Sequence, residues 1–344
     1  HFQTMLDYLI DKVSKAFYLI FTNFILDKKE VDLVNKVIVL GSLNVDTILK
    51  IKRFPNPGET LETLDKSSAA GGKGANQAVA AVRSGAQTTM IGQIGHDDLG
   101  KFMIDSLQND HINVSPITVN DTVGTGTATV LLDENGQNCI LVYGGANQKI
   151  SPEDIKKISD NIKNSDFLIS QFETPQNATK AAFEIAKENS LTTILNPAPA
   201  SKIDSSLLTL TDLIVPNETE STVLTGIKIT DEKSMIETAK AFSKMGIDNL
   251  IITIGDRGVF YSTKEKSELV SAYHVKAVDT TAAGDTFIGA LSSQLKKDLS
   301  NIKSAISFAQ CASSITVQRL GAQPSIPTLN EIRIAEKNYE SVKN

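Results

Sequence analysis

The stretch with the clearest chemical potential lies near the C-terminal end of the chain, where residues 279–287 read DTTAAGDTF. The small residues Ala282, Ala283 and Gly284 let backbone N–H groups approach a ligand, and the following helix offers its positive end to an anion. Asp285 stands at the start of that helix, where an acidic residue can serve as an N-cap without any catalytic role. The stretch predicts an active-site turn and leaves the role of Asp285 open.

Two other groups of polar residues suit a hydroxylated ligand. Asn44 and Asp46 alternate with apolar residues, so they share one face of a strand, unless they only form a turn at its end. A glycine cluster at residues 71–74 leads into an alanine-rich helix, where Lys73 and Asn76 can bind hydroxyl groups. The cluster is not a Walker A loop, because glycine follows the lysine. Tight packing of a strand on a helix is the alternative explanation for these glycines.

Polar residues also follow the strands predicted in the middle of the chain. From residue 151 onward strands and helices alternate regularly, which predicts a parallel sheet covered on both faces. Functional residues in such sheets gather at the carboxyl ends of the strands, which points to Glu173, Asn196 and residues 217–220. Asn217 and Glu220 match a capping box equally well. Residues 255–258, which read GDRG, can cradle phosphates or form a hairpin turn.

The hydrophobic pattern places these residues on an α/β scaffold. The expected strands cover residues 37–41, 47–51, 60–64, 88–93, 127–132, 139–143, 167–171, 192–195, 213–216, 250–254 and 259–262. The expected helices cover a segment ending near residue 85, and residues 99–107, 152–163, 176–189, 286–297 and 302–318, with a charged helix at the C-terminus. The first strand is not followed by G-x-G-x-x-G, so a dinucleotide-binding fold is not expected.

The expected organisation is one main domain, residues 37–330, between an N-terminal extension, 1–36, and a C-terminal helix, 331–344. Two hairpins, at about residues 44–66 and 124–147, should form a separate small sheet whose apolar positions need cover from the ligand site or a second subunit. The extension holds an aromatic-rich helical stretch that is too short to span a bilayer. Its first four residues, ahead of Met5, are interpreted as a remnant of cloning.

Composition excludes several classes of protein. Asp and Glu number 40 against 34 Lys and Arg, and a net charge of −6 argues against a dedicated nucleic-acid or anionic-membrane binder. The two cysteines show no metal-binding spacing, so neither a disulfide framework nor a zinc site is expected, and a reducing cytoplasm fits best. The four histidines are scattered and form no catalytic cluster.

Three motifs occur in a recognisable order: GGKGAN at 71–76, NETE at 217–220 and TTAAGD at 280–285. With them the chain resembles the ribokinase-like sugar kinases, the PfkB carbohydrate kinase family, from about residue 37 to residue 327. The resemblance implies a three-layer α/β sandwich with a central, mostly parallel sheet and a small β-sheet lid. It also implies ATP-dependent phosphorylation of D-ribose at the 5-hydroxyl, which gives D-ribose 5-phosphate and ADP.

The resemblance also implies site residues. Asp285 would be the catalytic base, and the N–H groups of Ala282, Ala283 and Gly284 would stabilise the transferring oxygens. The family often has glycine where this chain has Ala282, which still leaves the amide accessible. Sugar-binding residues would be Asn44, Asp46, Gly72, Lys73, Asn76, Glu173 and Asp285. ATP, with Mg²⁺, would be bound by Asn217, Glu220, Thr253, Gly255, Gly258 and Gly284. A K⁺ ion would be held by Asp279, Thr281, Thr316, Arg319, Gly321 and Ser325.

The same resemblance implies a homodimer formed through the lid, with no nucleic-acid or membrane partner. Two alternatives remain: a kinase of this fold acting on another sugar or a nucleoside, and a non-catalytic sugar-binding protein. The three motifs together change the interpretation of Asp285, which we expect to serve both as a cap and as a base.

Overall fold

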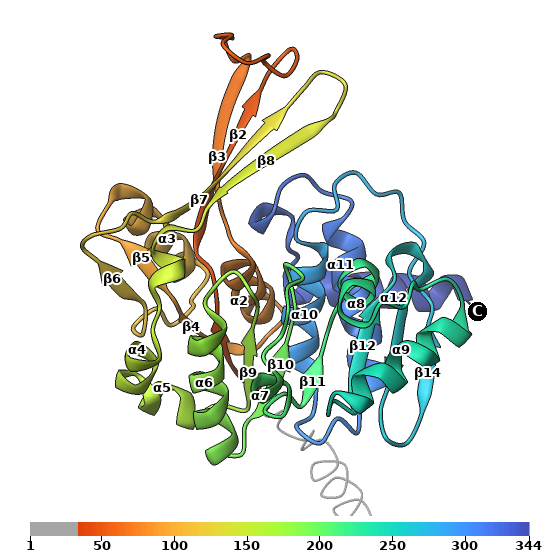
Figure 1. The fold of residues 1–344 in the computed structure, drawn as a ribbon. Coiled ribbons are helices and arrows are strands. Elements are labelled where there is room, and N and C mark those ends of the chain that lie inside the picture. Colours follow the sequence, from red (N-terminus) through yellow and green to blue (C-terminus); the bar gives the residue numbers. More distant parts are fainter. Residues whose placement is uncertain (1–33, 344) are drawn as a thin grey trace, which may run out of the picture. The chain divides into compact units, whose positions relative to one another are not determined.

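The computed structural model describes residues 34–343, and the N-terminal extension up to residue 33 lies outside the described residues. Its centre is an eight-stranded sheet in the order β14-β13-β12-β11-β10-β9-β1-β4 (Figure 1). The strands from β12 to β4 are parallel, and β13 and β14 are antiparallel. The bounds are β1 Lys36–Leu40, β4 Gln87–Ile91, β9 Phe167–Ser170, β10 Thr192–Leu195, β11 Leu213–Ile214, β12 Leu250–Thr253, β13 Val259–Ser262 and β14 Ser267–Val270.

The central strands are buried on both faces. In β1, Val37 and Val39 belong to one hydrophobic core, whereas Ile38 and Leu40 belong to the other. Because side chains alternate along a strand, a continuous apolar run satisfies two cores at once. One face is covered by α2 Lys73–Arg83, α3 Asp98–Asn109, α10 Ala283–Gln294, α11 Ile302–Thr316 and α12 Leu329–Lys343. The other is covered by α4 Pro152–Lys157, α5 Ser159–Lys163, α6 Gln176–Glu188, α7 Ser205–Leu208, α8 Glu218–Thr225 and α9 Glu232–Lys244. The predicted three-layer architecture is confirmed.

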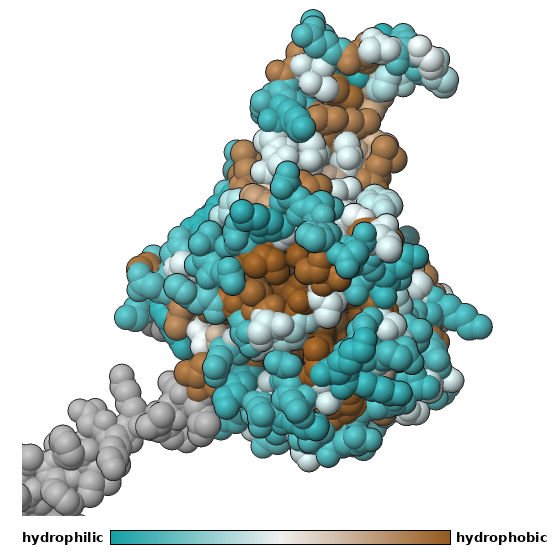
Figure 2. Space-filling model, turned by 90° about the vertical axis from the view of Figure 1, so that its left-hand side faces the viewer, coloured by the Kyte–Doolittle hydropathy of each residue, from teal (hydrophilic) through white to brown (hydrophobic). Residues whose placement is uncertain are grey.

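A four-stranded sheet, which we call the lid sheet, rises above this body in the order β3-β2-β7-β8 (Figure 1). Its strands are β2 Asn44–Lys50, β3 Asp65–Gly71, β7 Gly126–Leu132 and β8 Asn138–Tyr143. All of β8 is exposed, including Ile140, Leu141, Val142 and Tyr143, each more than half exposed. Figure 2 shows the hydrophobic surface that the lid sheet carries above the body.

The strand predicted at residues 60–64 is wrong. These residues lie in the connection between β2 and β3, and the strand that returns is the polar segment Asp65–Gly71. Its pairing with β2 runs from Asn44 opposite Gly71 to Lys50 opposite Asp65. The strand β3 is held by its backbone pairing with β2, and its sequence, DKSSAAG, has no alternating pattern of large apolar residues. Hydrophobic periodicity therefore did not predict it.

Other differences from the sequence-based expectations are local. The helix predicted at 152–163 is interrupted at Ile158 and forms α4 and α5. The short strands β5 Gln93–Gly95 and β6 Thr118–Asn120 form a third sheet, and β14 extends the central sheet. Three 3₁₀ helices complete the described part: η1 Gly145–Lys149, η2 Gly255–Arg257 and η3 Gln323–Ser325. No described helix has the length and apolar character needed to cross a bilayer.

Candidate active site

Asp285 lies at the bottom of a cavity at the carboxyl ends of the central strands. It is the third residue of α10, and its side chain is only 7% exposed. The N-cap of α10 is Ala282, in the left-handed region with φ 59°, and no side chain caps this helix. The prediction that Asp285 also caps the helix is therefore wrong. Its carboxylate instead receives hydrogen bonds from two consecutive residues of α2, Asn76 Nδ2 to Oδ2 at 3.0 Å and Gln77 Nε2 to Oδ1 at 3.0 Å.

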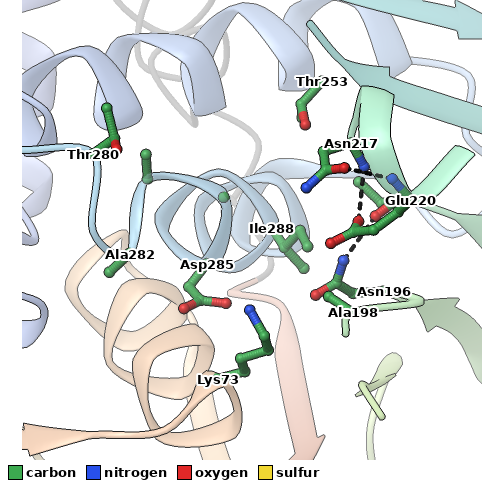
Figure 3. A pocket seen from close by; sticks show the side chains of 13 residues that line it. Lys73, Asn196, Ala198, Asn217, Glu220, Thr253, Thr280, Ala282, Asp285 and Ile288 are labelled. Carbon is green, nitrogen blue, oxygen red and sulfur yellow. Dashed lines mark hydrogen bonds between the residues drawn. The ribbon is translucent and has the colours of Figure 1, made fainter. Parts of the chain in front are cut away.

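Lys73 supplies the positive charge that faces this carboxylate (Figure 3). Burial raises the pKa of Asp285, and the ammonium group of Lys73 acts against that rise. In turn, the negative charge of Asp285 raises the pKa of Lys73. The pair therefore keeps a buried carboxylate next to a cation inside the cavity, an arrangement that suits proton transfer.

The start of α10 presents unused backbone donors to the same cavity. The N–H of Ala283 donates to the carbonyl of Thr280 at 3.2 Å, whereas those of Ala282, Gly284 and Asp285 have no acceptor among residues 34–343. Free N–H groups at a helix N-terminus carry partial positive charge and bind anions. Two of the three predicted donors, the N–H groups of Ala282 and Gly284, are therefore free. The N–H group of Asp285, which was not predicted, is also free.

The predicted sugar-binding residues lie around Asp285 on α2, β2 and the end of β9. Asn44 is buried, and its Oδ1 accepts a hydrogen bond from Asn147 Nδ2 at 2.8 Å. Glu173 Oε2 accepts from Ser42 Oγ at 2.5 Å and from the Lys73 N–H at 3.1 Å. Oδ1 of Asn76 is buried and has no partner in the described structure, although buried polar atoms are normally hydrogen-bonded.

Asp46 is the second unusual carboxylate of the site. Burial, followed by the negative charges of Glu173 and Asp285, raises its pKa to about 6. A Cβ atom at Gly71 would lie 2.1 Å from Asp46 Oδ2, so glycine makes room for this side chain. Gly72 has φ +89°, and a Cβ there would lie 2.9 Å from the N atom of Asn44. Packing against β2 therefore explains these two glycines, and the sugar-binding role of Gly72 stays a prediction.

The predicted nucleotide-binding residues lie on the other side of Asp285. One cavity of about 190 Å³ contains Lys73, Glu220 and Asp285, and a larger one of about 730 Å³ extends past Gly255 and Gly258. Both cavities are lined by Asn217, Thr253, Thr280, Ala283 and Gly284, so they adjoin at the start of α10. This geometry can hold an anionic group between a buried carboxylate and a large, partly apolar cavity.

Several of these residues also have structural duties. Asn217 and Glu220 form the predicted capping box of α8, with hydrogen bonds of 2.8 Å in each direction. Gly258, with φ +110°, lies between β12 and β13, and a Cβ there would lie 2.1 Å from the carbonyl oxygen of Val270. Residues 255–258 therefore form the hairpin connection, and Gly255, Asp256 and Gly258 also line the larger cavity.

The residues predicted to hold K⁺ form two loops joined by Asp279. Its Oδ1 accepts from the N–H and hydroxyl of Thr281, at 2.9 and 2.6 Å, and its Oδ2 accepts from the Gly321 N–H at 2.9 Å. Burial alone would raise the pKa of Asp279, but these hydrogen bonds outweigh burial and lower the pKa. Thr316 ends α11, Arg319 pairs with Glu331, and the Ser325 hydroxyl donates to the Ala322 carbonyl at 2.6 Å. Among the described residues, no group of three or more His, Cys, Asp or Glu side chains could hold a metal ion.

Some site residues were not predicted. Ser42 and Asn147 hold Glu173 and Asn44, and Gln77 contacts Asp285 directly. Asn196 was identified only as a residue at a strand end, yet it lines the smaller cavity. The sequence signal for Gln77 was a glutamine within an alanine-rich helix. Such a helix is expected to be buried, and a buried polar side chain needs hydrogen-bond partners.

Comparison with known proteins gives consistent matches. The family model described as "pfkB family carbohydrate kinase" matches residues 34–329. The chain is 48% identical to the ribokinase of Staphylococcus aureus, over 87% of this chain and 98% of that protein. It is 42% identical to the ribokinase of Haemophilus influenzae, over 85% of this chain and 95% of that protein. The structure of Arabidopsis thaliana ribokinase complexed with ribose and ATP superposes with a TM-score of 0.84 at 29% identity, covering 89% of this chain and 99% of that one.

Proposed function

Because the chain belongs to the pfkB family of carbohydrate kinases, we propose that it transfers the γ-phosphoryl group of ATP to the 5-hydroxyl of D-ribose. The products are D-ribose 5-phosphate and ADP. The observation that carries this proposal is the position of Asp285, a buried carboxylate that lines the smaller cavity beside free backbone N–H groups and accepts a hydrogen bond from Asn76 of the predicted sugar site. An acceptor hydroxyl on one side and a phosphoryl donor on the other would meet at this carboxylate.

In the proposed mechanism Asp285 is the general base. It accepts the proton of the attacking hydroxyl as the new O–P bond forms and the bond to the ADP oxygen breaks. The free N–H groups of Ala282, Gly284 and Asp285 stabilise the negative charge on the transferring oxygens. Lys73 lines the same cavity and adds a positive charge on the path of the phosphoryl group.

Ribose would bind between the lid sheet and α2. Asp46 and Asn44 offer a carboxylate and an amide from β2, and Glu173 and Asn76 offer acceptors from the body. A site built from such groups discriminates against an analogue that lacks a hydroxyl, because a buried polar group would then lose its partner. This chemistry favours ribose over 2-deoxyribose. Closure of the lid sheet over the sugar would exclude water from the transfer.

Two cations fit the donor groups of the site. Glu220 is a partly exposed carboxylate at the smaller cavity that can bind the waters of Mg²⁺, which usually keeps several of them. The loops of Asp279, Thr281, Thr316, Arg319, Gly321 and Ser325 contain oxygen ligands of the kind that a hard cation such as K⁺ requires, namely a carboxylate, hydroxyl groups and main-chain carbonyls. When bound, these cations neutralise negative charge on the phosphates and beside the anion-binding turn.

The exposed apolar strand β8 supports a homodimer formed through the lid sheet. Ile140, Leu141, Val142 and Tyr143 are consecutive and exposed on an edge strand, which is a surface that proteins usually cover. Sedimentation should show a dimer that Leu141→Lys dissociates. Ile334→Lys is the matched control, because Ile334 is a similarly exposed apolar residue on α12. We also propose a cytoplasmic location, which suits a chain with only two cysteines and no disulfide framework in its sequence pattern.

The function is tested by measuring ATP-dependent phosphorylation of ribose, 2-deoxyribose, fructose and nucleosides with the purified protein. We expect the highest kcat/KM for ribose, and phosphate on its 5-oxygen by NMR. A strong preference for a nucleoside or another sugar would show that ribose is not the substrate, although the protein would still be a kinase. Ribose binding without any transfer would support a non-catalytic sugar-binding protein instead.

A further inference from the structure

Gln77 is a wholly buried residue that lines neither of the two cavities beside Asp285. It follows Asn76 on α2 and lies among alanines. A buried carboxamide is costly unless its donors and acceptor are all used, so its contacts reveal why the helix keeps a polar residue here.

Each polar atom of Gln77 has a partner. Nε2 donates to Asp285 Oδ1 at 3.0 Å and to Asn196 Oδ1 at 3.2 Å. Oε1 accepts a hydrogen bond from Gln171 Nε2 at 2.6 Å. The Gln171 contact orients the carboxamide so that its NH₂ group, and not its oxygen, faces the carboxylate of Asp285.

Backbone packing fixes both ends of this arrangement. Gln171 is itself fully buried, and a Cβ atom at Gly41 would lie 2.2 Å from its Oε1, so glycine at 41 makes room for it. At the other end, a Cβ at Gly289 would lie 2.5 Å from the carbonyl oxygen of Gln77. Gly289 therefore lets α10 approach α2 closely enough for Asp285 to reach Gln77.

The two oxygens of Asp285 are thus held differently. Asn76 donates to Oδ2 and its own Oδ1 accepts no hydrogen bond, whereas Gln77 donates to Oδ1 and lines neither of the two cavities. We infer that Gln77, held by Gln171, is a positioning residue that aims the Asp285 carboxylate at the acceptor hydroxyl. This inference rests on the proposed function of Asp285 as the base.

The same contact has an electrostatic consequence. A hydrogen bond donated to a carboxylate favours its ionised form, so Gln77 opposes the rise that burial causes in the pKa of Asp285. The other charged groups that act on Asp285 are Lys73 on α2, Glu173 after β9, Asp46 on β2 and Glu220 on α8. All of them stay in place when only Gln77 is changed.

The test is Gln77→Met, which keeps the size of the side chain and removes its hydrogen bonds. We expect kcat to fall about 10- to 100-fold, the loss typical of a hydrogen bond to a charged group, with little change in KM for either substrate. The acidic limb of the kcat–pH profile should move to higher pH. Gln171→Met should show the same pattern with a smaller amplitude, and it carries the test if Gln77→Met does not fold.

Gln93→Met is the matched control. Gln93 is also a buried glutamine with two hydrogen bonds, but it lies on β5, remote from both cavities. It should keep the kcat and the pH profile of the parent protein. Loss of kcat in Gln77→Met without movement of the pH profile, or no loss at all, would overturn the inference.

A second readout separates this inference from the proposed function. The pKa of Asp285 can be followed in the free protein by its carboxyl ¹³C resonance, assigned through its disappearance in Asp285→Asn. We expect a higher pKa in Gln77→Met even if ribose proves not to be the acceptor. An unchanged pKa would refute the contact's role whatever the substrate is.

Discussion

The central sheet buries its apolar side chains, whereas strand β8 of the lid sheet leaves its apolar side chains exposed. The four residues of β9 and the four of β10 are all buried between two helical layers. Every residue of β8, including a run of four large apolar side chains, is exposed. Asp285 belongs to a helix packed on the central sheet, and Asp46 belongs to the lid sheet. The body therefore holds the buried core and the proposed base, while the lid sheet holds the exposed apolar strand β8 and the proposed sugar contact of Asp46.

The largest effect should come from the body. Asp285→Asn keeps the shape of the side chain and removes the proposed base. We expect kcat to fall about 10²- to 10⁴-fold, because general base catalysis contributes that much, while KM for ribose changes little. Steady-state kinetics at saturating ATP would measure both. Near-normal transfer by this variant would show that another group accepts the proton.

Asp97→Asn is a suitable control for that substitution. Asp97 caps α3 through the N–H of Gly100 at 2.8 Å and lies outside both cavities. Asparagine is also a good N-cap, so the helix should persist. Its kcat should equal that of the parent protein.

The next effect concerns stability, and it compares the two sheets directly. Ile38→Ala removes a fully buried side chain from β1 and should lower the free energy of unfolding by about 2–5 kcal/mol. Leu141→Ala on β8, where the side chain is 62% exposed, should change it by about 0.5 kcal/mol or less. Denaturant unfolding at low protein concentration measures both. Equal losses would mean that β8 is buried in solution, as it would be in a dimer that persists at that concentration.

Sequence reasoning succeeded where one segment contains its own evidence. The apolar run of β1 and the Asn217–Glu220 box required no distant partner to be recognised. It failed where the cause lies elsewhere in the chain. The strand β3 is defined by pairing with β2, and the importance of Gln77 depends on Asp285, 208 residues away. The predicted cap at Asp285 failed for the same reason, since its carboxylate is engaged by α2 and not by its own helix.

The smallest effect is expected at Asp46, a residue that we expect to favour ribose binding and to lower the free energy of unfolding. The pKa of Asp46 rises from an ordinary 3.8 to about 6 in the folded protein. Between pH 3.8 and about 6 the Asp46 carboxyl group binds more protons in the folded state than in the unfolded state. Ionisation of Asp46 therefore lowers the free energy of unfolding as pH rises through this range, and the loss persists above pH 6. Asp46→Asn should therefore raise the free energy of unfolding at pH 7, on the order of 1–3 kcal/mol, with no gain near pH 3.

The same substitution should raise KM for ribose roughly 10- to 100-fold, because a carboxylate makes stronger hydrogen bonds to hydroxyl groups than an amide does. In the parent protein KM should rise as pH falls below about 6, and this dependence should be absent from Asp46→Asn. Asp65→Asn, at the exposed far end of the same sheet, should leave KM unchanged. A stability gain that is independent of pH would mean that Asp46 acts through packing, and the lid sheet would then share the structural role of the body.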